Sequence, residues 1–213
     1  MIVSNINFLK YLFVTSLLLS NIMASKIMDI GGLILPAAVV LYPLTFLFTD
    51  VVSEVEGKKS AHSLVIMGFC MSLFMALMLF IGRILPPASY WEHQNSYNVI
   101  LGVTPRIVLA SMIAYLVSQN HDVWAFHWWK KRTAGRHLWI RNNLSTMTSQ
   151  LIDSVLFIGI AFAGVYSAKM VAGMILGQYI VKIGIAILDT PFCYALVRFY
   201  EKDKEQRQGS RLP

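Results

Sequence analysis

The chain alternates between long hydrophobic stretches and shorter polar segments. Six hydrophobic stretches occur, at about residues 8–27, 33–50, 63–85, 105–119, 143–165 and 172–199. A helix needs about 20 apolar residues to cross a hydrocarbon core of roughly 30 Å. The pattern therefore predicts an all-α integral membrane protein. Residues 1–200 would form one bundle of six transmembrane helices, and residues 201–213 a mixed-charge, frayed tail.

The fifth stretch differs from the others because one side of its predicted helix is polar. Asn143, Thr146, Gln150 and Asp153 fall at helical spacing. An ionised carboxylate at membrane depth costs several kcal/mol unless it is paired or hydrated. The polar side must therefore face protein or a water-filled cavity, and we interpret it as the lining of a substrate pocket.

The sixth stretch carries a lysine, Lys182, on the same face as Gln178. At a rise of about 1.5 Å per residue, Asp153 and Lys182 each lie roughly 15 Å inside the bilayer. Opposite charges at one depth predict an ion pair, or two arms of one binding site. The alternative is a pair that only fixes the bundle, but a buried pair adds little stability over apolar packing. The predicted substrate-binding residues are Asp153, Gln150, Lys182, Gln178, Asn21 and Asn143.

Four further charged residues are placed at the two ends of the predicted pocket. Asp50 and Glu54 are four residues apart at the end of the second stretch, so both carboxylates project from one helix face. Asp189 lies at a similar depth near the end of the sixth stretch. These three carboxylates form either a cytoplasmic exit path or hydrated helix ends. Arg106 lies at the opposite mouth, where the fourth stretch begins.

Two prolines, Pro36 and Pro43, interrupt the second stretch. A proline inside a membrane helix frees a backbone carbonyl and kinks the helix. The prolines therefore predict either a packed kink or a broken helix that exposes carbonyls to the pocket. The glycines 31 and 32 before this stretch predict a short turn.

Composition and charge agree with membrane residence. The chain is 56% hydrophobic and 14% charged, with a mean hydropathy of +0.60. Its net charge of +7 is segregated by loop, and most Lys and Arg residues fall on the side of the two termini. The positive-inside rule therefore places both termini in the cytoplasm.

The segment 120–142 mixes tryptophans with basic residues. Such a mixture is typical of a belt over anionic lipid, although it also occurs where proteins stack single-stranded nucleic acid. Because membrane-length stretches flank it, we expect the lipid bilayer as its partner and no nucleic acid.

Catalytic and metal-binding motifs are absent from the sequence. The five histidines form no HExxH pair, and neither a GxSxG motif nor a phosphate-binding loop occurs. Cys70 and Cys193 lie in apolar runs, which favours buried small residues over a disulfide or a metal pair. We therefore expect no enzyme activity, no metal and no cofactor.

The polar residues of the predicted pocket comprise carboxylates, amides, hydroxyls and one ammonium, accompanied by aromatic residues. This inventory suits a flat, hydrogen-bonding ligand such as a heterocyclic base, which aromatic walls would stack. An amino acid or a vitamin would fit a similar list.

Several motifs, taken together, resemble one transporter family. They are Thr49 to Lys58 (TDVVSEVEGK), Pro105-Arg106 with Ala110-Ser111, Arg136 to Asn142 (RHLWIRN), Ser145 through Gln150 to Asp153, and Lys182 through Asp189-Thr190-Pro191. On these motifs the chain from about Phe8 to Tyr200 resembles the queuosine precursor transporter family, also called the vitamin uptake transporter family. That family is related to the substrate-binding subunits of energy-coupling-factor importers. The chain departs from the family at Glu56, where an aromatic residue usually precedes the glycine.

The resemblance implies six helices, a cell inner membrane location, and uptake of 7-cyano-7-deazaguanine and 7-aminomethyl-7-deazaguanine without an ATPase module. In this secondary transporter or facilitator, Asp153 and Gln150 would take the pyrimidine edge of the deazaguanine. Lys182, with Gln178, would bind or balance the carboxylate. A faint likeness between residues 44–55 and 145–156 is consistent with an inverted repeat, whose halves would rock for alternating access.

The alternative is a substrate-binding subunit of an energy-coupling-factor type importer that requires an ATPase module. A ridge of small residues, Gly173, Gly177 and Gly184, would then dock a partner helix. Such a ridge more often packs within its own chain. A homodimer is a further expected state.

Overall fold

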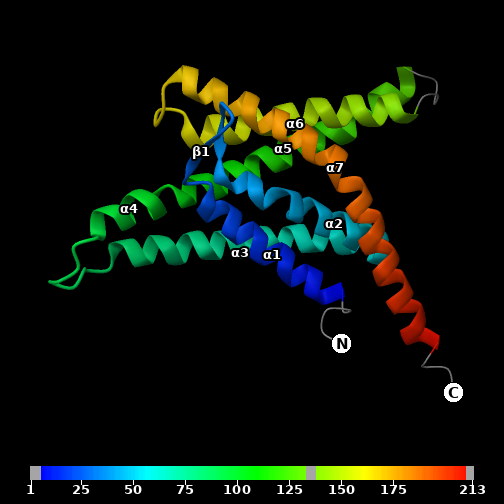
Figure 1. Ribbon diagram of the computed structural model, residues 1–213, viewed down its shortest axis with the longest axis horizontal. Coiled ribbons are helices and arrows are strands. Elements are labelled where there is room, and N and C mark those ends of the chain that lie inside the picture. Colours follow the sequence, from blue (N-terminus) through cyan, green and yellow to red (C-terminus); the bar gives the residue numbers. More distant parts are fainter. Residues whose placement is uncertain (1–5, 133–137, 210–213) are drawn as a thin grey trace.

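Residues 6–132 and 138–209 are described by a computed structural model, in which helices predominate (Figure 1). The elements are α1 (Ile6–Met23), β1 (Ile27–Ile30), β2 (Leu33–Pro36), the 3-10 helix η1 (Ala37–Val40), α2 (Tyr42–Glu56), α3 (Lys58–Ile84), α4 (Gln94–Gly102), α5 (Thr104–Arg132), α6 (Leu138–Phe162) and α7 (Ala168–Gly209).

Four stretches within the described residues are long and apolar enough to cross a membrane. They are Ile6–Met23, Lys58–Ile84, Gln94–His121 and Ala168–Ile185. The apolar part of α6, Met147–Phe162, is shorter, and α2 has only 15 residues. A helix of that length reaches roughly 22 Å, less than a hydrocarbon core of about 30 Å. The helical, multi-pass character is therefore confirmed, whereas the count of six spans stays a prediction.

The prediction of one proline-broken helix over residues 33–50 is wrong in its first part. Residues 27–36 form an antiparallel hairpin that pairs Ile27 with Pro36 and Ile30 with Leu33. Gly31 and Gly32 adopt φ values of 60° and 86°, which suit glycine, and paired glycines between apolar segments favour a two-residue hairpin turn. The carboxylate of Asp29 accepts a hydrogen bond from the backbone N–H of Gly32 at 2.8 Å.

Neither proline kinks a helix. Pro36 ends β2, and Pro43 lies in the first turn of α2, where its missing N–H has no partner to lose. Both alternatives, a packed kink and a broken helix, are therefore wrong, because the helix begins only at Tyr42.

Two other predicted boundaries also change. The expected loop after α3 contains the short helix α4, whose Gln94 and Asn98 side chains bond to each other at 3.2 Å. Helix α7 continues to Gly209, through residues expected to fray, because Glu, Lys, Gln and Arg in this segment favour helix.

The helices form two packed groups that lie on either side of the molecule (Figure 1). In the first, residues of α1, α2 and α3 bury one another, among them Phe13, Val51 and Leu64. In the second, residues of α5, α6 and α7 do so, among them Ile107 and Phe157. Helix α7 begins in the second group and contributes Tyr200 to the core of the first. The two groups therefore enclose the space in which the polar residues of α2, α5 and α6 meet.

The glycine ridge of α7 packs at one of its three positions. A Cβ atom added at Gly177 would lie 2.8 Å from the backbone oxygen of Ile34 in β2, whereas one added at Gly173 or Gly184 would meet nothing within 4 Å. At Gly177 the ridge therefore packs against the β-hairpin of the same chain, as such ridges more often do.

We predict that Gly177→Ala destabilises the protein by about 1–3 kcal/mol, because a close backbone contact cannot give way as a side chain can. Gly173→Ala is the matched control on the same helix, and it should be neutral or stabilising by up to about 1 kcal/mol. Thermal unfolding in detergent measures both. Equal melting temperatures for the two variants would contradict the packing of β2 on α7.

Candidate functional site

A cavity of about 150 Å³ lies between the two helix groups. It is lined by Tyr42, Thr45, Phe46, Thr49 and Asp50 of α2, by Ser111, Tyr115, Ser118 and Gln119 of α5, by Gln150, Asp153 and Phe157 of α6, and by Phe13, Leu17, Val65 and Phe69 of α1 and α3. The predicted polar side of α6 thus faces a cavity through Gln150 and Asp153. Its lining therefore combines hydroxyls, amides and carboxylates with aromatic rings.

An ion pair joins α6 to α7 beside this cavity. The Nζ atom of Lys182 contacts Oδ2 of Asp153 directly, as the comparison of their depths predicts. The Lys182 side chain is only 5% exposed, and that of Asp153 is 20% exposed. Lys182 also lies over the ring of Tyr42, with Nζ 5.6 Å from the ring centroid, where the π face attracts a cation. The ammonium is thus compensated on two sides, while the carboxylate keeps some access to the cavity.

The second carboxylate oxygen of Asp153 is held weakly. Its neighbour is the hydroxyl of Ser118 at 3.5 Å, but that hydroxyl also lies 3.2 Å from the carbonyl oxygen of Tyr115. A hydroxyl has one proton to donate, so it serves one acceptor at a time. Oδ1 of Asp153 can therefore accept a hydrogen bond from a ligand.

One turn further along the contact between α5 and α6, the ring nitrogen Nδ1 of His121 and the hydroxyl of Ser149 lie 3.0 Å apart. Ser149 is one turn before Asp153 on α6, and His121 follows Ser118 on α5. These two polar contacts fix the register of α5 against α6 and so the position of Asp153.

Three buried amides have an atom with no hydrogen-bond partner among the described residues. These atoms are Oε1 of Gln150, which lines the cavity, Nε2 of Gln178, which is 3% exposed, and Oδ1 of Asn21. Most buried polar atoms in proteins are bonded, so each such atom indicates a place that a ligand or water completes. Gln150 therefore has the stronger connection to the cavity, since Gln178 does not belong to its lining.

Asn21 lies outside the lining of the cavity. It is 1% exposed, and its Nδ2 donates to the hydroxyl of Ser72 at 3.3 Å, which joins α1 to α3. The side chain of Asn143 lies outside the described part of the chain.

Three of the predicted gate residues, Asp50, Glu54 and Arg106, are not brought together. Asp50 lines the cavity, while Glu54, one turn further, is exposed and outside the lining. Arg106 donates from Nε to the carbonyl of Ile160 and from Nη2 to that of Ala163, both at 2.6 Å. Arg106 thereby satisfies carbonyls at the end of α6, which have no partner within the helix. The side chain of Asp189 lies outside the described part.

Sequence reasoning missed the aromatic wall that α2 and α6 supply. Tyr42 meets Phe157 edge to face, with ring centroids 6.3 Å apart, and stacks on Phe46 at the same centroid distance. The spacing of four residues between Tyr42 and Phe46, and between Thr45 and Thr49, was the available signal. This signal was obscured because the second helix was predicted to begin at residue 33 and not at Tyr42.

Glu56, the departure from the family pattern, has a structural role. Its carboxylate pairs with Lys10 of α1 at 2.6 Å and accepts a hydrogen bond from the hydroxyl of Ser60. The pair ties the end of α2 to α1.

The comparisons with known proteins agree on one family. Residues 36–196 match the family described as "Putative vitamin uptake transporter". The chain is 30% identical over 186 residues to the "Probable queuosine precursor transporter" of Bacillus subtilis, across 87% of this chain and 81% of that protein. No solved structure matches the chain.

We predict that Asp153→Asn lowers the free energy of unfolding by about 3 kcal/mol, because it leaves the Lys182 ammonium buried without its counter-charge. The double variant Asp153→Asn/Lys182→Gln should recover much of that loss, since no buried charge remains. Glu56→Gln is the matched control at a more exposed pair and should cost less than about 1 kcal/mol.

Thermal unfolding in detergent, followed by tryptophan fluorescence, compares these variants. An Asp153→Asn protein as stable as the wild type would contradict the buried pair. So would a double variant that is less stable than either single one.

Proposed function

This chain belongs to the vitamin uptake transporter family, and we propose that it takes up the queuosine precursors 7-cyano-7-deazaguanine and 7-aminomethyl-7-deazaguanine across the cell inner membrane. Membership makes it a transporter rather than an enzyme. The cavity between the helix groups is the proposed substrate site. The observation that carries this proposal is a carboxylate and an amide, Asp153 and Gln150, that line the same cavity as aromatic rings of α2.

The proposed binding mode follows from the donors and acceptors of a guanine-like edge. Such an edge offers adjacent N–H donors and one carbonyl oxygen. Oδ1 of Asp153 would accept an N–H, and the amide of Gln150 would accept from the exocyclic amine or donate to the carbonyl. Tyr42 and Phe157 would border the bicyclic ring, with offset or edge contacts of the kind aromatic groups prefer.

Lys182 has a supporting role in this proposal. Its contact with Oδ2 compensates the charge of the Asp153 carboxylate, orients it in an apolar setting, and leaves the other oxygen for the substrate. Without that ammonium, an empty cavity would hold an uncompensated carboxylate at membrane depth. Gln178, one turn before Lys182, is proposed to hold the α7 side of the site.

The proposed transport step is alternating access by rocking of the group α1–α3 against the group α5–α7. Asp50 at the cavity, with Glu54 and Asp189 beyond it, would form the path toward the cytoplasm. At the opposite mouth of the cavity, Arg106 would hold α5 against the end of α6. The distribution of Lys and Arg supports cytoplasmic termini in this proposal.

The second candidate is a substrate-binding subunit that requires a separate ATPase module, which rests on the likeness of the family to such subunits. It would use the same cavity. The two candidates differ in whether the purified protein alone moves substrate across a bilayer.

We predict that liposomes containing only this protein exchange or accumulate labelled 7-cyano-7-deazaguanine. Asp153→Asn should reduce the rate on the order of 100-fold, since a charge-assisted hydrogen bond contributes roughly 1.5–3 kcal/mol. Asp29→Asn, the same substitution at an exposed aspartate of the hairpin, should leave the rate unchanged.

The double variant Asp153→Asn/Lys182→Gln separates binding from stability, because it should regain stability and still fail to transport. Unchanged uptake by Asp153→Asn would remove Asp153 from the site. Tight binding without transport by the wild type would favour the subunit that needs an ATPase, and absence of both would exclude this substrate.

A further inference from the structure

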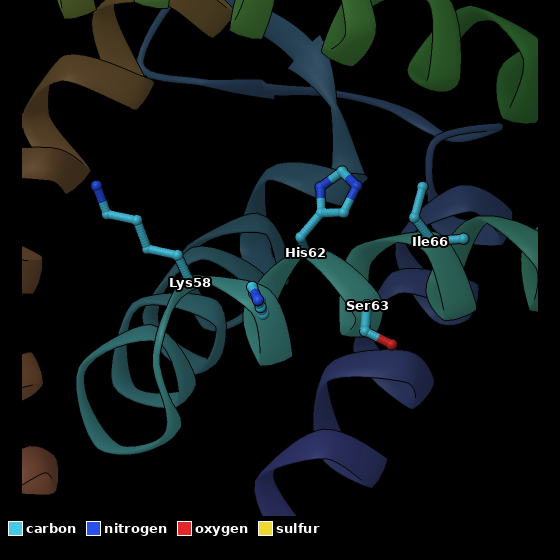
Figure 2. Close-up of a pocket in the computed structure, with 5 residues that line it drawn as sticks. Lys58, His62, Ser63 and Ile66 are labelled. Carbon is cyan, nitrogen blue, oxygen red and sulfur yellow. The ribbon is translucent and has the colours of Figure 1, made fainter.

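A second hollow lies at the beginning of α3, away from the substrate cavity. It is an open groove of about 540 Å³, lined by Lys58, Lys59, His62, Ser63 and Ile66. Lys58, His62 and Ile66 follow one another at intervals of four residues, and Figure 2 shows their side chains projecting from the same side of the helix. The groove is therefore built by one face of α3.

The polar end of this groove is positively charged. Neither Lys58 nor Lys59 forms an ion pair among the described residues, and the first turn of α3 contains no acidic residue. The carboxylate of the nearby Glu56 is engaged by Lys10 and Ser60. Lysines at a helix start also add to the positive end of the helix dipole, which an anion would offset. An anionic ligand is thus favoured here.

The other end of the groove leads onto an apolar surface. Ile66, 46% exposed, begins a line of exposed residues that continues through Cys70, Leu73 and Leu77 toward the end of α3. Their spacing of three or four residues keeps them on the face that the groove occupies. The expectation that Cys70 is buried is wrong, because it is exposed on this face. Since Lys58–Ile84 is long and apolar enough to span a membrane, this face can meet lipid tails.

We infer that this groove is a binding site for an anionic phospholipid. The phosphate would lie between Lys58, Lys59 and the imidazole of His62, and an acyl chain would run along the face that begins at Ile66. A soluble phosphate would use the charged end alone and would leave the adjoining apolar face uncovered. Basic pockets at the ends of membrane helices recognise anionic headgroups by this combination. The inference is independent of the transported substrate.

The experiment measures retention of lipid by the purified full chain with native mass spectrometry, using phosphatidylglycerol and phosphatidylcholine as probes. The wild type should retain phosphatidylglycerol in preference. Each lysine near an anionic surface contributes roughly fivefold, so Lys58→Gln/Lys59→Gln should lower this affinity about 25-fold. Lys26→Gln/Lys169→Gln removes two exposed lysines outside the groove and should retain wild-type affinity.

A second variant, Ser63→Glu, places a negative charge in the groove at an exposed position, and should also release phosphatidylglycerol. It keeps the test decisive if the double lysine variant does not fold. Equal retention of phosphatidylglycerol by wild type and both groove variants would overturn the inference. So would wild-type binding of glycerol phosphate as strong as that of phosphatidylglycerol, since this would indicate an anion site without lipid selectivity.

Discussion

The ion pair between Asp153 and Lys182 constrains the rest of the molecule, because a buried charge that loses its partner is strongly destabilising. The pair requires α6 and α7 to lie side by side with these residues at one level. Tyr42 then closes over the ammonium from α2, and Ser118 approaches the carboxylate from α5. Four helices thus meet at one charged pair. The cavity lies beside this pair. Apolar residues could replace such a pair at little cost in stability, so its presence supports the proposed functional role.

Contacts away from the cavity keep these helices in register. The His121–Ser149 contact and the bonds from Arg106 to the end of α6 hold α5 against α6 at two levels. The β-hairpin rests on Gly177 of α7, five residues before Lys182. On the other side, Lys10 and Glu56 tie α1 to α2. Each helix group therefore has its own ties, while the cavity between them is lined from both, an arrangement that the proposed rocking of one group against the other requires.

Features that depend on local periodicity could be predicted from the sequence. The hydrophobic stretches gave the long helices, and the polar spacing on α6 gave Gln150 and Asp153 as cavity residues. Comparing the predicted depths of Asp153 and Lys182 identified them as partners, because opposite charges inside a bilayer are favoured when they lie at the same depth and can pair.

Features that depend on tertiary context could not be predicted in this way. The hairpin was missed because its four-residue strands continue the hydrophobic stretch of α2, so hydropathy alone does not separate them. Asn21 has the polarity of a binding residue, yet only packing shows that it faces Ser72. The position of Arg106 at the end of α6 follows from a contact between residues more than 50 positions apart, which no local pattern encodes.

An experimental structure with 7-cyano-7-deazaguanine bound would test the central claim most directly, namely that the cavity beside Asp153 receives the substrate. We predict that the pyrimidine edge lies within hydrogen-bond distance of Asp153 and Gln150, and that the ring borders Tyr42 and Phe157. A ligand bound elsewhere, with Asp153 and Lys182 still in contact only with protein, would contradict the account. The ion pair would then be a structural tie between α6 and α7.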